Sequence, residues 1–476
     1  MALLTQTFAP DRQAVVIGAS IAGLVTARVL ANHVDRVVMI ERDRFSNGEE
    51  PRNGIPQGHH AHILLARGRQ LLDELFPGLQ AELAAAGAPL MDFTGDVAQL
   101  APVGWLMRAP SGLTTYAASR PLLEARLRAR VLADSRITIR EGCDVVGLLG
   151  DHNRQVVGVR VRNRPAEAGQ HADDENLLAT LVVDASGRSS RTPAWLHELG
   201  YPTPTETVVN SFLGYASAIF TPNVGFQTSW KGMYVQPAPP TDKRGGVIWP
   251  VEGGRWVVTL LGMGRDYPPT NEAAFMAFAK SLRTPLFYEA IQQAQRLSPI
   301  TGFRATENRR RHYERMQSWP DGFVVLGDAV SAFNPVYGQG MTVASMSAAV
   351  LDRCLAMQRR RLGDSALAGV SRHFQQQLAR SNATAWTLAT GPDLRAPDTE
   401  GAPPSWLDRM MYRYLDRVFV QATRDAEVVK RLFHVLHLST SPSALFHPRM
   451  VAAAMGYRRA VANRVSHASS TPTRST

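Results

Sequence analysis

The chain has 476 residues, 45% of them hydrophobic, and a formal net charge of +11 at pH 7. This length suits one large composite domain, or two or three smaller ones, with an ample core. The composition argues against a membrane protein, because no apolar run approaches the roughly 18 to 20 residues of a span. It also excludes a disulfide framework, since the cysteines are only Cys143 and Cys354. With no secretory signal pattern at the start, we expect a reducing cytoplasm.

The basic charge raises the possibility of a nucleic-acid partner. That function needs lysines and arginines gathered on one face. Here the arginines are spread along the chain, and the one compact run, residues 309–311, has Glu307 and Glu314 close by. We therefore predict a solvated basic surface and no nucleic-acid partner. A basic body would also suit an acidic carrier protein or a membrane surface.

A strand, a tight turn and a helix are expected first. Residues 14–17 form a short apolar, β-branched run typical of a buried parallel strand, and residues 21–30 suit a helix. A second buried strand, residues 37–40, ends at Glu41. A carboxylate about twenty residues past the glycines can bind both ribose hydroxyls of an adenine nucleotide.

The turn of this unit fits a pyrophosphate. Gly18 lets the turn close, Gly23 lets helix and strand pack closely, and the phosphates would sit on the N–H groups of the positive helix end. Ser20 stands where the middle glycine is usual, and we expect its small side chain to be tolerated and its hydroxyl to bond a phosphate. An ordinary strand–helix–strand crossover with chance glycines is the alternative.

A turn-rich loop of functional length, residues 47–58, leads to a histidine cluster at residues 59–62. Metal binding is disfavoured, because no carboxylate or cysteine lies at ligand spacing and adjacent histidines point apart on a helix. We expect Gln57, Gly58 and His60 to line a cofactor or substrate face instead.

Strands are expected around residues 97–107 and 113–118. Arg120 and Pro121 then open a long helix, because proline is favourable in a first helical turn. Arg120 at the helix mouth can reach a phosphate, or it can be an exposed helix-start arginine. A small β meander is expected at residues 137–139, 145–149 and 156–161.

Alternating strands dominate residues 203–262. The clearest pair is a hairpin of residues 247–249 and 256–260 across a Glu-Gly-Gly-Arg turn. This pattern predicts a mainly antiparallel sheet inserted into an α/β frame. Two helices follow, begun at Thr270 and Thr284.

Two further buried strands end in loops that carry polar residues. Residues 181–183 end at Asp184, and residues 323–326 end at Gly327 and Asp328. A loop, residues 334–341, then enters a small-residue helix. Its glycines aim bare N–H groups at whatever binds there.

Four motifs carry a family resemblance by their order: the glycine turn with Glu41, Arg120 at a helix start, Asp184 after a strand, and residues 327–328 with the glycine-rich loop. Together they resemble the para-hydroxybenzoate hydroxylase-like flavoprotein monooxygenases over roughly Gln13 to Met357. The resemblance implies FAD, with its ADP half on the first unit, its ribityl chain on Asp328 and the flavin N1–C2=O edge near residues 335–341. A helix dipole there would stabilise the negative charge of reduced flavin. The usual aspartate-glycine pair is replaced by residues 184–187, and the usual histidine after Asp328 is absent.

The cofactor-binding residues that this reading implies are Gly18, Ala19, Ser20, Ala22, Gly23, Glu41, Arg42, Arg120, Val145, Asp184, Gly187, Gly327, Asp328, Pro335, Gly338, Gln339, Gly340 and Met341. Candidate flavin-face or substrate residues are Gln57, Gly58, His60, Phe212, Tyr215, Phe226, Trp230, Tyr234 and Trp249. The aromatics would form an apolar pocket over the flavin, and core packing is the alternative for each of them. No metal ligand is expected, and the flavin-centred chemistry leaves the catalytic side chains unassigned.

Three stretches, PRNGIPQGHHAHILL, VIWPVEGGRWVVTL and GDAVSAFNPVYGQGM, look like the bacterial flavin epoxidases of polyether-ionophore biosynthesis, the lasalocid and monensin type. The resemblance implies FAD reduction by NAD(P)H or a separate reductase, reaction with O₂ at flavin C4a, and oxygen transfer to isolated alkenes of a hydrophobic or carrier-bound polyene. Flavin halogenases are also relatives, but only Trp249 and Pro250 match their tryptophan-rich pattern. Aromatic hydroxylation, prenyl-chain reduction and a non-catalytic FAD-binding role stay open.

The expected fold is therefore α/β: a Rossmann-like FAD-binding domain with an inserted, mainly antiparallel substrate domain and a C-terminal helical region. The expected boundaries are 10–96, 97–200 and 301–370 for the FAD-binding domain, 201–300 for the substrate domain, 371–465 for the C-terminal helices and 466–476 for a polar tail.

Overall fold

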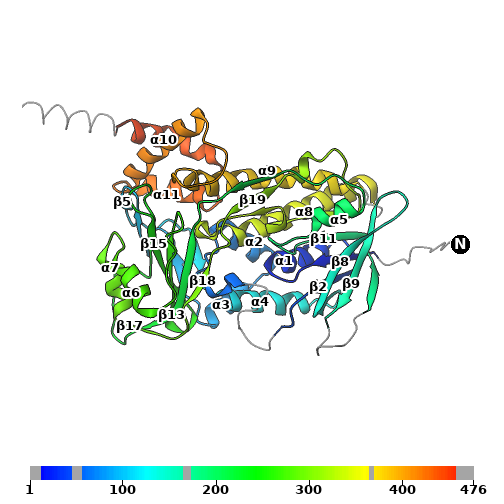
Figure 1. Cartoon of the computed structure of the whole chain (residues 1–476), viewed down its shortest axis with the longest axis horizontal. Coiled ribbons are helices and arrows are strands. Elements are labelled where there is room, and N and C mark those ends of the chain that lie inside the picture. Colours follow the sequence, from blue (N-terminus) through cyan, green and yellow to red (C-terminus); the bar gives the residue numbers. More distant parts are fainter. Residues whose placement is uncertain (1–11, 46–55, 165–172, 364–368, 457–476) are drawn as a thin grey trace, which may run out of the picture.

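The computed structural model describes residues 12–45, 56–164, 173–363 and 369–456. The fold contains a five-stranded parallel sheet of order β20-β11-β1-β2-β7, of which β11 and β2 are labelled in the right-hand half of Figure 1. Strands β20, β11, β1 and β2 are almost continuously apolar and buried, as expected where both faces of a sheet are covered, whereas the edge strand β7 is mostly part-exposed. Their bounds are β1 Gln13–Ile17, β2 Arg36–Glu41, β7 Ile137–Glu141, β11 Leu181–Asp184 and β20 Phe323–Val325.

Helices and a small antiparallel sheet cover the parallel sheet. Helix α1 (Ile21–Leu30) packs against β1, β2 and the long helix α8 (Gly340–Leu362). The small sheet, of order β10-β9-β8, contacts β11 through β9. Its bounds are β8 Cys143–Gly150, β9 Val156–Asn163 and β10 Asp174–Leu178.

The predicted meander is wrong in two places. Its first segment is β7, which pairs in parallel with β2 instead, from Val37 opposite Ile137. The physical reason is the crossover helix α4 (Arg120–Leu132), which brings the chain back parallel to β2. The third strand of the small sheet is instead β10, which lies outside the three segments expected for the meander.

A second, larger sheet lies beside the parallel one, of order β17-β13-β16-β15-β14-β4-β5 with β18 paired to β13. It is antiparallel except where β14 pairs with β4, and it contains the predicted hairpin as β15 and β16. Its first two strands, β4 and β5, precede the expected start of the substrate domain, whose boundaries stay a prediction. The bounds are β4 Val97–Ala101, β5 Gly104–Trp105, β13 Gly214–Pro222, β14 Gly232–Val235, β15 Arg244–Val251, β16 Arg255–Gly262, β17 Ala294–Arg296 and β18 Thr301–Phe303.

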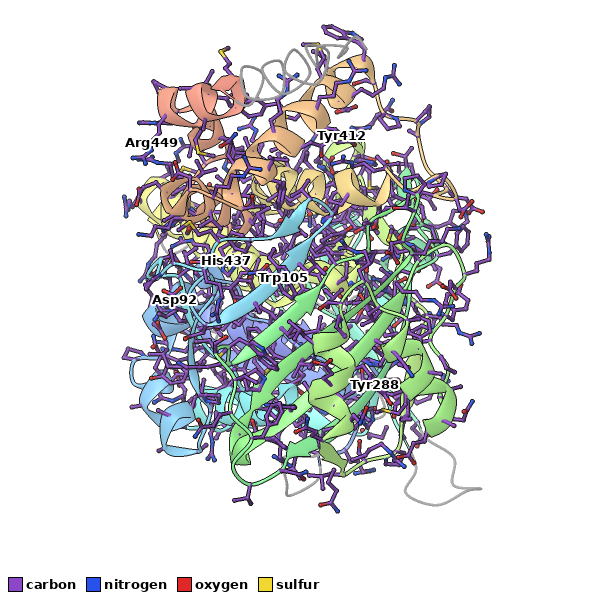
Figure 2. All side chains as sticks on the ribbon, turned by 90° about the vertical axis from the view of Figure 1, so that its left-hand side faces the viewer. Asp92, Trp105, Tyr288, Tyr412, His437 and Arg449 are labelled. Atoms are coloured by element: carbon purple, nitrogen blue, oxygen red, sulfur yellow. The ribbon has the colours of Figure 1, made fainter. Side chains whose placement is uncertain are left out.

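The two faces of the large sheet have different neighbours. Helices α6 (Glu272–Lys280) and α7 (Pro285–Gln292) cover one face through a buried apolar cluster. In Figure 2 Tyr288 of α7 lies in front of this sheet. The other face looks toward the parallel sheet and, at one end, toward the C-terminal helices.

The remaining elements link these layers. The short sheets are β3 Leu90–Asp92 with β6 Thr114–Tyr116, and β12 Glu206–Val209 with β19 Asn308–Arg311 and β21 Ser331–Ala332. The remaining helices are α2 Ala66–Leu75, α3 Leu79–Ala85, α5 Thr192–Glu198, α9 Val370–Asp393, α10 Trp406–Ala422 and α11 Ala426–Leu436.

The C-terminal helices join the frame at buried polar contacts. His437, just after α11, accepts a hydrogen bond at Nδ1 from the N–H of Ala66 (3.2 Å), the first residue of α2. Its carbonyl accepts from the N–H of Arg67 (3.3 Å), and its ring meets the Phe93 ring at 4.2 Å. The imidazole therefore satisfies an N–H group that the helix itself leaves unbonded.

The predicted fold class is confirmed: a parallel Rossmann-like frame, antiparallel sheets and a helical C-terminal region. Within the described ranges, no helix combines the length and apolar character needed to cross a bilayer.

Helix α1 approaches the first turn so closely that we expect Gly23→Ala to be strongly destabilising. An added Cβ would lie 1.9 Å from the carbonyl oxygen of Gly18, so backbone would have to move. We expect a loss of about 3 kcal/mol in the free energy of unfolding, measured by urea titration. Gly456→Ala, where a Cβ meets nothing within 4 Å, is the control. Equal stability of the two variants would contradict the close approach.

Candidate functional site

Two cavities meet near the carboxyl ends of β1, β2 and β11. The larger has a volume of about 420 Å³ and the smaller about 160 Å³. They share Ser20, Arg42, Ala185, Ser186 and Ser189, so one elongated ligand can occupy both. This is the edge at which open α/β sheets bind their ligands.

Glu41 forms part of the smaller cavity at the end of β2. The side chain is buried, and its two oxygens accept hydrogen bonds from the N–H of Ala19 (2.8 Å) and of Asp43 (3.0 Å). These bonds fix the carboxylate beside Arg42 and Val145, which line the same cavity. A carboxylate held in this way can accept the hydroxyl hydrogens of a ribose.

The turn before α1 is shaped for a pyrophosphate. Gly18 has a φ of +95°, and a Cβ there would lie 2.8 Å from the carbonyl oxygen of Ala185. Ser20 is the N-cap residue of α1 and makes no side-chain cap. Its hydroxyl instead accepts a hydrogen bond from Nη2 of Arg120 (2.8 Å). The helix end and the Arg120 cation can thus both face an anion.

The late glycine-rich loop borders the larger cavity. Asp328, Pro335, Gly338 and Met341 line it, and α8 begins at Gly340 with no acidic residue in its first turn. Burial raises the pKa of Asp328, while Arg188 and Arg120 oppose the shift. The start of a long helix can therefore hold a negatively charged flavin edge here.

A buried polar network fixes this loop from behind. Asp393, at the end of α9, is wholly buried, and its carboxylate accepts hydrogen bonds from Nδ2 of Asn308 (2.7 Å), the hydroxyl of Tyr337 (2.7 Å) and Nδ2 of Asn334 (3.1 Å). Asn334 in turn accepts from the hydroxyl of Tyr215 (3.0 Å). Burial raises the pKa of Asp393, and the donors around it oppose that shift.

One face of the large sheet forms the opposite wall of the larger cavity. Tyr215 is level with Leu261 and Phe303, and Val247 with Thr259, and all five line the cavity. Alternate residues of these strands point to the other face, into the cluster under α6 and α7. The wall is therefore mostly apolar.

Two histidines lie between this sheet and the loop at residues 334–341. Burial lowers the pKa of His60 to about 4, with a smaller effect of His59. Burial also lowers the pKa of His62 to about 3, with a smaller effect of Arg120. The carbonyl of His60 lies 2.9 Å from Nδ1 of His62, which must carry the hydrogen because a carbonyl only accepts. Both imidazoles are neutral at pH 7.

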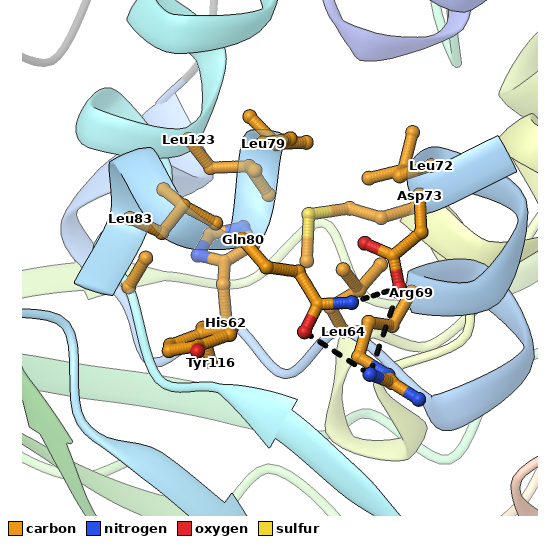
Figure 3. A pocket seen from close by; sticks show the side chains of 12 residues that line it. His62, Leu64, Arg69, Leu72, Asp73, Leu79, Gln80, Leu83, Tyr116 and Leu123 are labelled. Atoms are coloured by element: carbon orange, nitrogen blue, oxygen red, sulfur yellow. Dashed lines mark hydrogen bonds and ion pairs between the residues drawn. The ribbon is translucent and has the colours of Figure 1, made fainter. Parts of the chain in front are cut away.

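His62 and Met341 also line a further small cavity of about 20 Å³ (Figure 3). Its other walls are mainly leucines, and polar side chains lie at one end: Arg69 is 3.6 Å from Asp73, and Gln80 bonds both. The space is about that of one water molecule.

The structure brings many of the predicted site residues together. Those that line one or both main cavities are Gly18, Ser20, Ala22, Glu41, Arg42, His60, Arg120, Val145, Gly187, Tyr215, Asp328, Pro335, Gly338, Gly340 and Met341. Ala19, Gly23 and Gly327 shape the adjoining turns, and Gln339 is buried at the N-cap of α8. Gly58 lies in a short 3₁₀ turn outside both linings. The Gln57 side chain is not among those that the structure describes.

Asp184 is not placed for direct contact with a cofactor. It is wholly buried, and its carboxylate accepts hydrogen bonds from the N–H of Ser186 (2.8 Å) and the hydroxyls of Ser190 and Thr192 (both 2.5 Å). The residue instead holds the turn after β11, whose residues 185–189 line the cavities.

Most of the aromatics expected over the flavin lie elsewhere. Phe226 and Trp230 pack against Trp256 in the cluster under α6 and α7. Trp249 packs against Phe93, the Phe212 ring lies under the guanidinium of Arg265, and Tyr234 packs at the edge of the cluster beside the C-terminal helices. Phe212, Phe226 and Trp230 lie in connections outside the strands, and Tyr234 and Trp249 share the sheet face of Val247 but pack beside the C-terminal helices instead of lining the cavity.

Sequence reasoning missed several residues of the site. Thr259 lies in a predicted strand and Leu261 directly follows it. Because they are two residues apart, strand geometry places both side chains on one face, so one of them in the cavity predicts the other. Asp393 carried no signal, because its partners are 56 to 85 residues away in the chain.

Comparison with known proteins decides which dinucleotide fits. A family model described as FAD binding domain matches residues 11–375. The chain belongs to this family. FAD is thus the cofactor that fits the turn before α1, the Glu41 carboxylate and the late glycine-rich loop.

Curated relatives of this family member include the protein Rv3254 of Mycobacterium tuberculosis, 34% identical over 403 residues and 83% of each chain. The kynurenine 3-monooxygenase of Salinispora arenicola is 28% identical over 360 residues, 72% of each chain. Among solved structures, flavin-dependent brominase Bmp2 has a TM-score of 0.63 at 14% identity, covering 95% of this chain and 99% of its own. That likeness shows the fold alone. Family and relatives together support an FAD-dependent monooxygenase.

If Glu41 holds the ribose, Glu41→Ala should lose FAD. The purified variant is expected to show less than about a tenth of the visible flavin absorbance per protein, because two charge-assisted bonds are removed from a buried site. Glu175→Ala, which removes an exposed partner of Arg140, is the control and should stay yellow. Full FAD occupancy in Glu41→Ala would refute the ribose assignment.

His437 should make the stability of the fold fall in acid. Burial, with a smaller effect of His434, lowers its pKa to about 3, below the ordinary 6.5. The unfolded chain therefore binds one more proton than the fold between these values, so stability is lost as the pH falls from about 6.5 toward 3.

The variant His437→Asn keeps an acceptor for Ala66 but does not titrate. Its free energy of unfolding should fall less steeply between pH 6 and 4.5, by as much as about 1.4 kcal/mol per pH unit. Urea titrations at both pH values measure this, and parallel slopes in the two proteins would contradict the assignment.

Proposed function

We propose that this protein is an FAD-dependent monooxygenase that epoxidises isolated alkenes of a hydrophobic polyene or polyketide chain, as in polyether biosynthesis. One observation carries the proposal. The sheet wall of the larger cavity is mostly apolar, and among the described lining residues Asp328, on the loop after β20, is the only carboxylate.

Bound FAD, reduced by NAD(P)H or by a separate reductase, would supply the activation of O₂. The chain's own residues would bind and orient it. Glu41 would hold the ribose, the start of α1 with Arg120 the pyrophosphate, and Gly338 and Gly340 the flavin edge. The wall formed by Leu261 and Phe303 would keep water away from the reacting atoms.

Among the described residues of the sheet wall there is no carboxylate base, which favours alkenes over phenols. Hydroxylation of a phenol gains from a base near the ring oxygen, whereas an isolated alkene needs no deprotonation. The charged Arg188, on the turn after β11, is already committed: its guanidinium pairs with Glu307 (3.0 Å) and donates to the carbonyl of Phe333 (3.0 Å).

Aromatic hydroxylation is the second candidate, because two of the curated relatives are kynurenine 3-monooxygenases. The rings of Tyr215, Phe303 and Phe333 on the cavity lining could pack against an aromatic substrate. Either substrate could be free or held on an acidic carrier protein, and the two buried, unpaired cysteines suit a reducing cytoplasm.

The test is incubation of the FAD-loaded protein with NADPH, a flavin reductase and ¹⁸O₂. The probes are the ethyl ester of a long-chain acid with two isolated double bonds, kynurenine and 4-hydroxybenzoate. We expect the ester to gain one ¹⁸O as an epoxide, detected by mass spectrometry, and FAD-free Glu41→Ala protein to give none. If ¹⁸O appeared only in hydroxylated kynurenine or hydroxylated 4-hydroxybenzoate, the result would favour aromatic hydroxylation. Saturation of the ester without O₂ would identify a reductase and end the monooxygenase proposal.

A further inference from the structure

The imidazole of His60 lies on the cavity-facing side of the large sheet. It is 7% exposed, and its ring centroid is 5.8 Å from that of Tyr215 and 5.5 Å from that of Phe303. All three residues line the larger cavity. Nε2 of His60 is buried and has no hydrogen-bond partner among the described residues. Because such an atom is costly to leave unpaired, it points to a partner other than the described residues, such as a ligand in the cavity.

The other ring nitrogen belongs to a chain of hydroxyls. Nδ1 of His60 lies 2.7 Å from Oγ of Ser217, which lies 2.7 Å from Oγ1 of Thr259. Ser217 and Thr259 are opposite one another on β13 and β16, and both are buried. Oγ1 of Thr259 also accepts a hydrogen bond from the N–H of Ala61 (3.2 Å).

The direction of this chain follows from counting hydrogens. If Thr259 donates to Ser217 and Ser217 donates to Nδ1 of His60, each hydroxyl hydrogen has an acceptor. In the reverse direction, the hydroxyl hydrogen of Thr259 finds no acceptor among the bonds of the described residues, in a buried site. The first direction is therefore favoured, and it leaves the hydrogen of His60 on Nε2.

Other polar groups at this wall are already engaged. The hydroxyl of Tyr215 donates to Asn334, and the guanidinium of Arg188 is paired with Glu307. His62 donates through Nδ1 to the backbone, so its Nε2 can only accept. His60 is thus the side chain of the wall that offers a hydrogen to a ligand.

We propose that His60 is a substrate-binding residue whose Nε2–H donates to a carbonyl-type oxygen, so that the substrate is a largely apolar molecule carrying an ester, ketone or carboxylate group. This rests on the proposed function for the use of the cavity as a substrate site. The Nε2–H of His60 would select among polyenes, because a plain hydrocarbon would leave this donor unpaired.

The test compares binding of two probes to the FAD-loaded protein without reductant. One is the dienoic ethyl ester used above, and the other is the diene hydrocarbon of equal length. Dissociation constants come from the change in flavin absorbance. In His60→Phe we expect the preference for the ester over the hydrocarbon to fall about tenfold, with hydrocarbon affinity kept. The exposed neighbour His59 supplies the control His59→Phe, which should keep the preference.

Ser217→Ala tests the hydroxyl chain without changing His60 itself. It should also weaken the preference, because Nδ1 of His60 then loses its donor and the imidazole hydrogen is no longer held on Nε2. ¹⁵N NMR of histidine-labelled holoprotein reads the tautomer directly, with the His60 signal assigned from its absence in His60→Phe. We expect the hydrogen on Nε2 in the parent protein and a larger share of the Nδ1–H tautomer in Ser217→Ala.

Three results would overturn the proposal: an Nδ1–H tautomer in the parent protein, an unchanged preference in His60→Phe, or no binding of the ester at all. A changed flavin reduction potential in His60→Phe with an unchanged preference would mean that the acceptor is the flavin. Binding is measured without turnover, so an ester preference without epoxide would refute the proposed reaction and leave the His60 assignment intact.

Discussion

The buried carboxylate of Asp393 is the constraint on which the cavity depends. A charge removed from water is tolerable only when hydrogen bonds replace its hydration, and here amide and hydroxyl donors from β19 and from the loop at residues 334–341 converge on it. Asn334 is one of them, and the loop that begins there carries the glycines of the cavity. The carboxylate itself lies beyond residues 11–375, the part that the FAD-binding family model matches. The end of α9, outside the matched part, therefore helps to hold the loop that borders the cavity.

Alternation along the strands of the large sheet separates two tasks. Side chains on one face, such as Val258 and Leu260, build a core with α6 and α7, while their neighbours Thr259 and Leu261 reach the cavity. Substitutions on the cavity side can change which molecule is bound without removing the helices' support. The turn before α1 and Glu41 belong to the parallel sheet, so such substitutions on the large sheet leave them unchanged.

The parts of the fold that could be predicted are those whose cause is local. The β1–α1–β2 unit, the role of Gly23 in close packing and the start of α4 at Arg120 all follow from short patterns of apolar residues, glycine and proline. Glu41 was identifiable because its spacing from the glycines is set by one strand–helix–strand unit. By contrast, Phe226 and Trp230 were assigned to the cavity by residue type, whereas the connection between β13 and β14 that carries them packs against Trp256. Asp393, Ser217 and Thr259 act through partners far away in the sequence, so no window of the chain contains their signal.

The cap that His437 places on α2 ties the last described helices to the segment that presents His60 and His62. Swapping substrate-facing segments between relatives would therefore require the distal helices to travel with them. A chimaera that exchanged residues 56–75 alone would set a foreign helix start against this imidazole, and the segment that replaces His60 and His62 would lose this support.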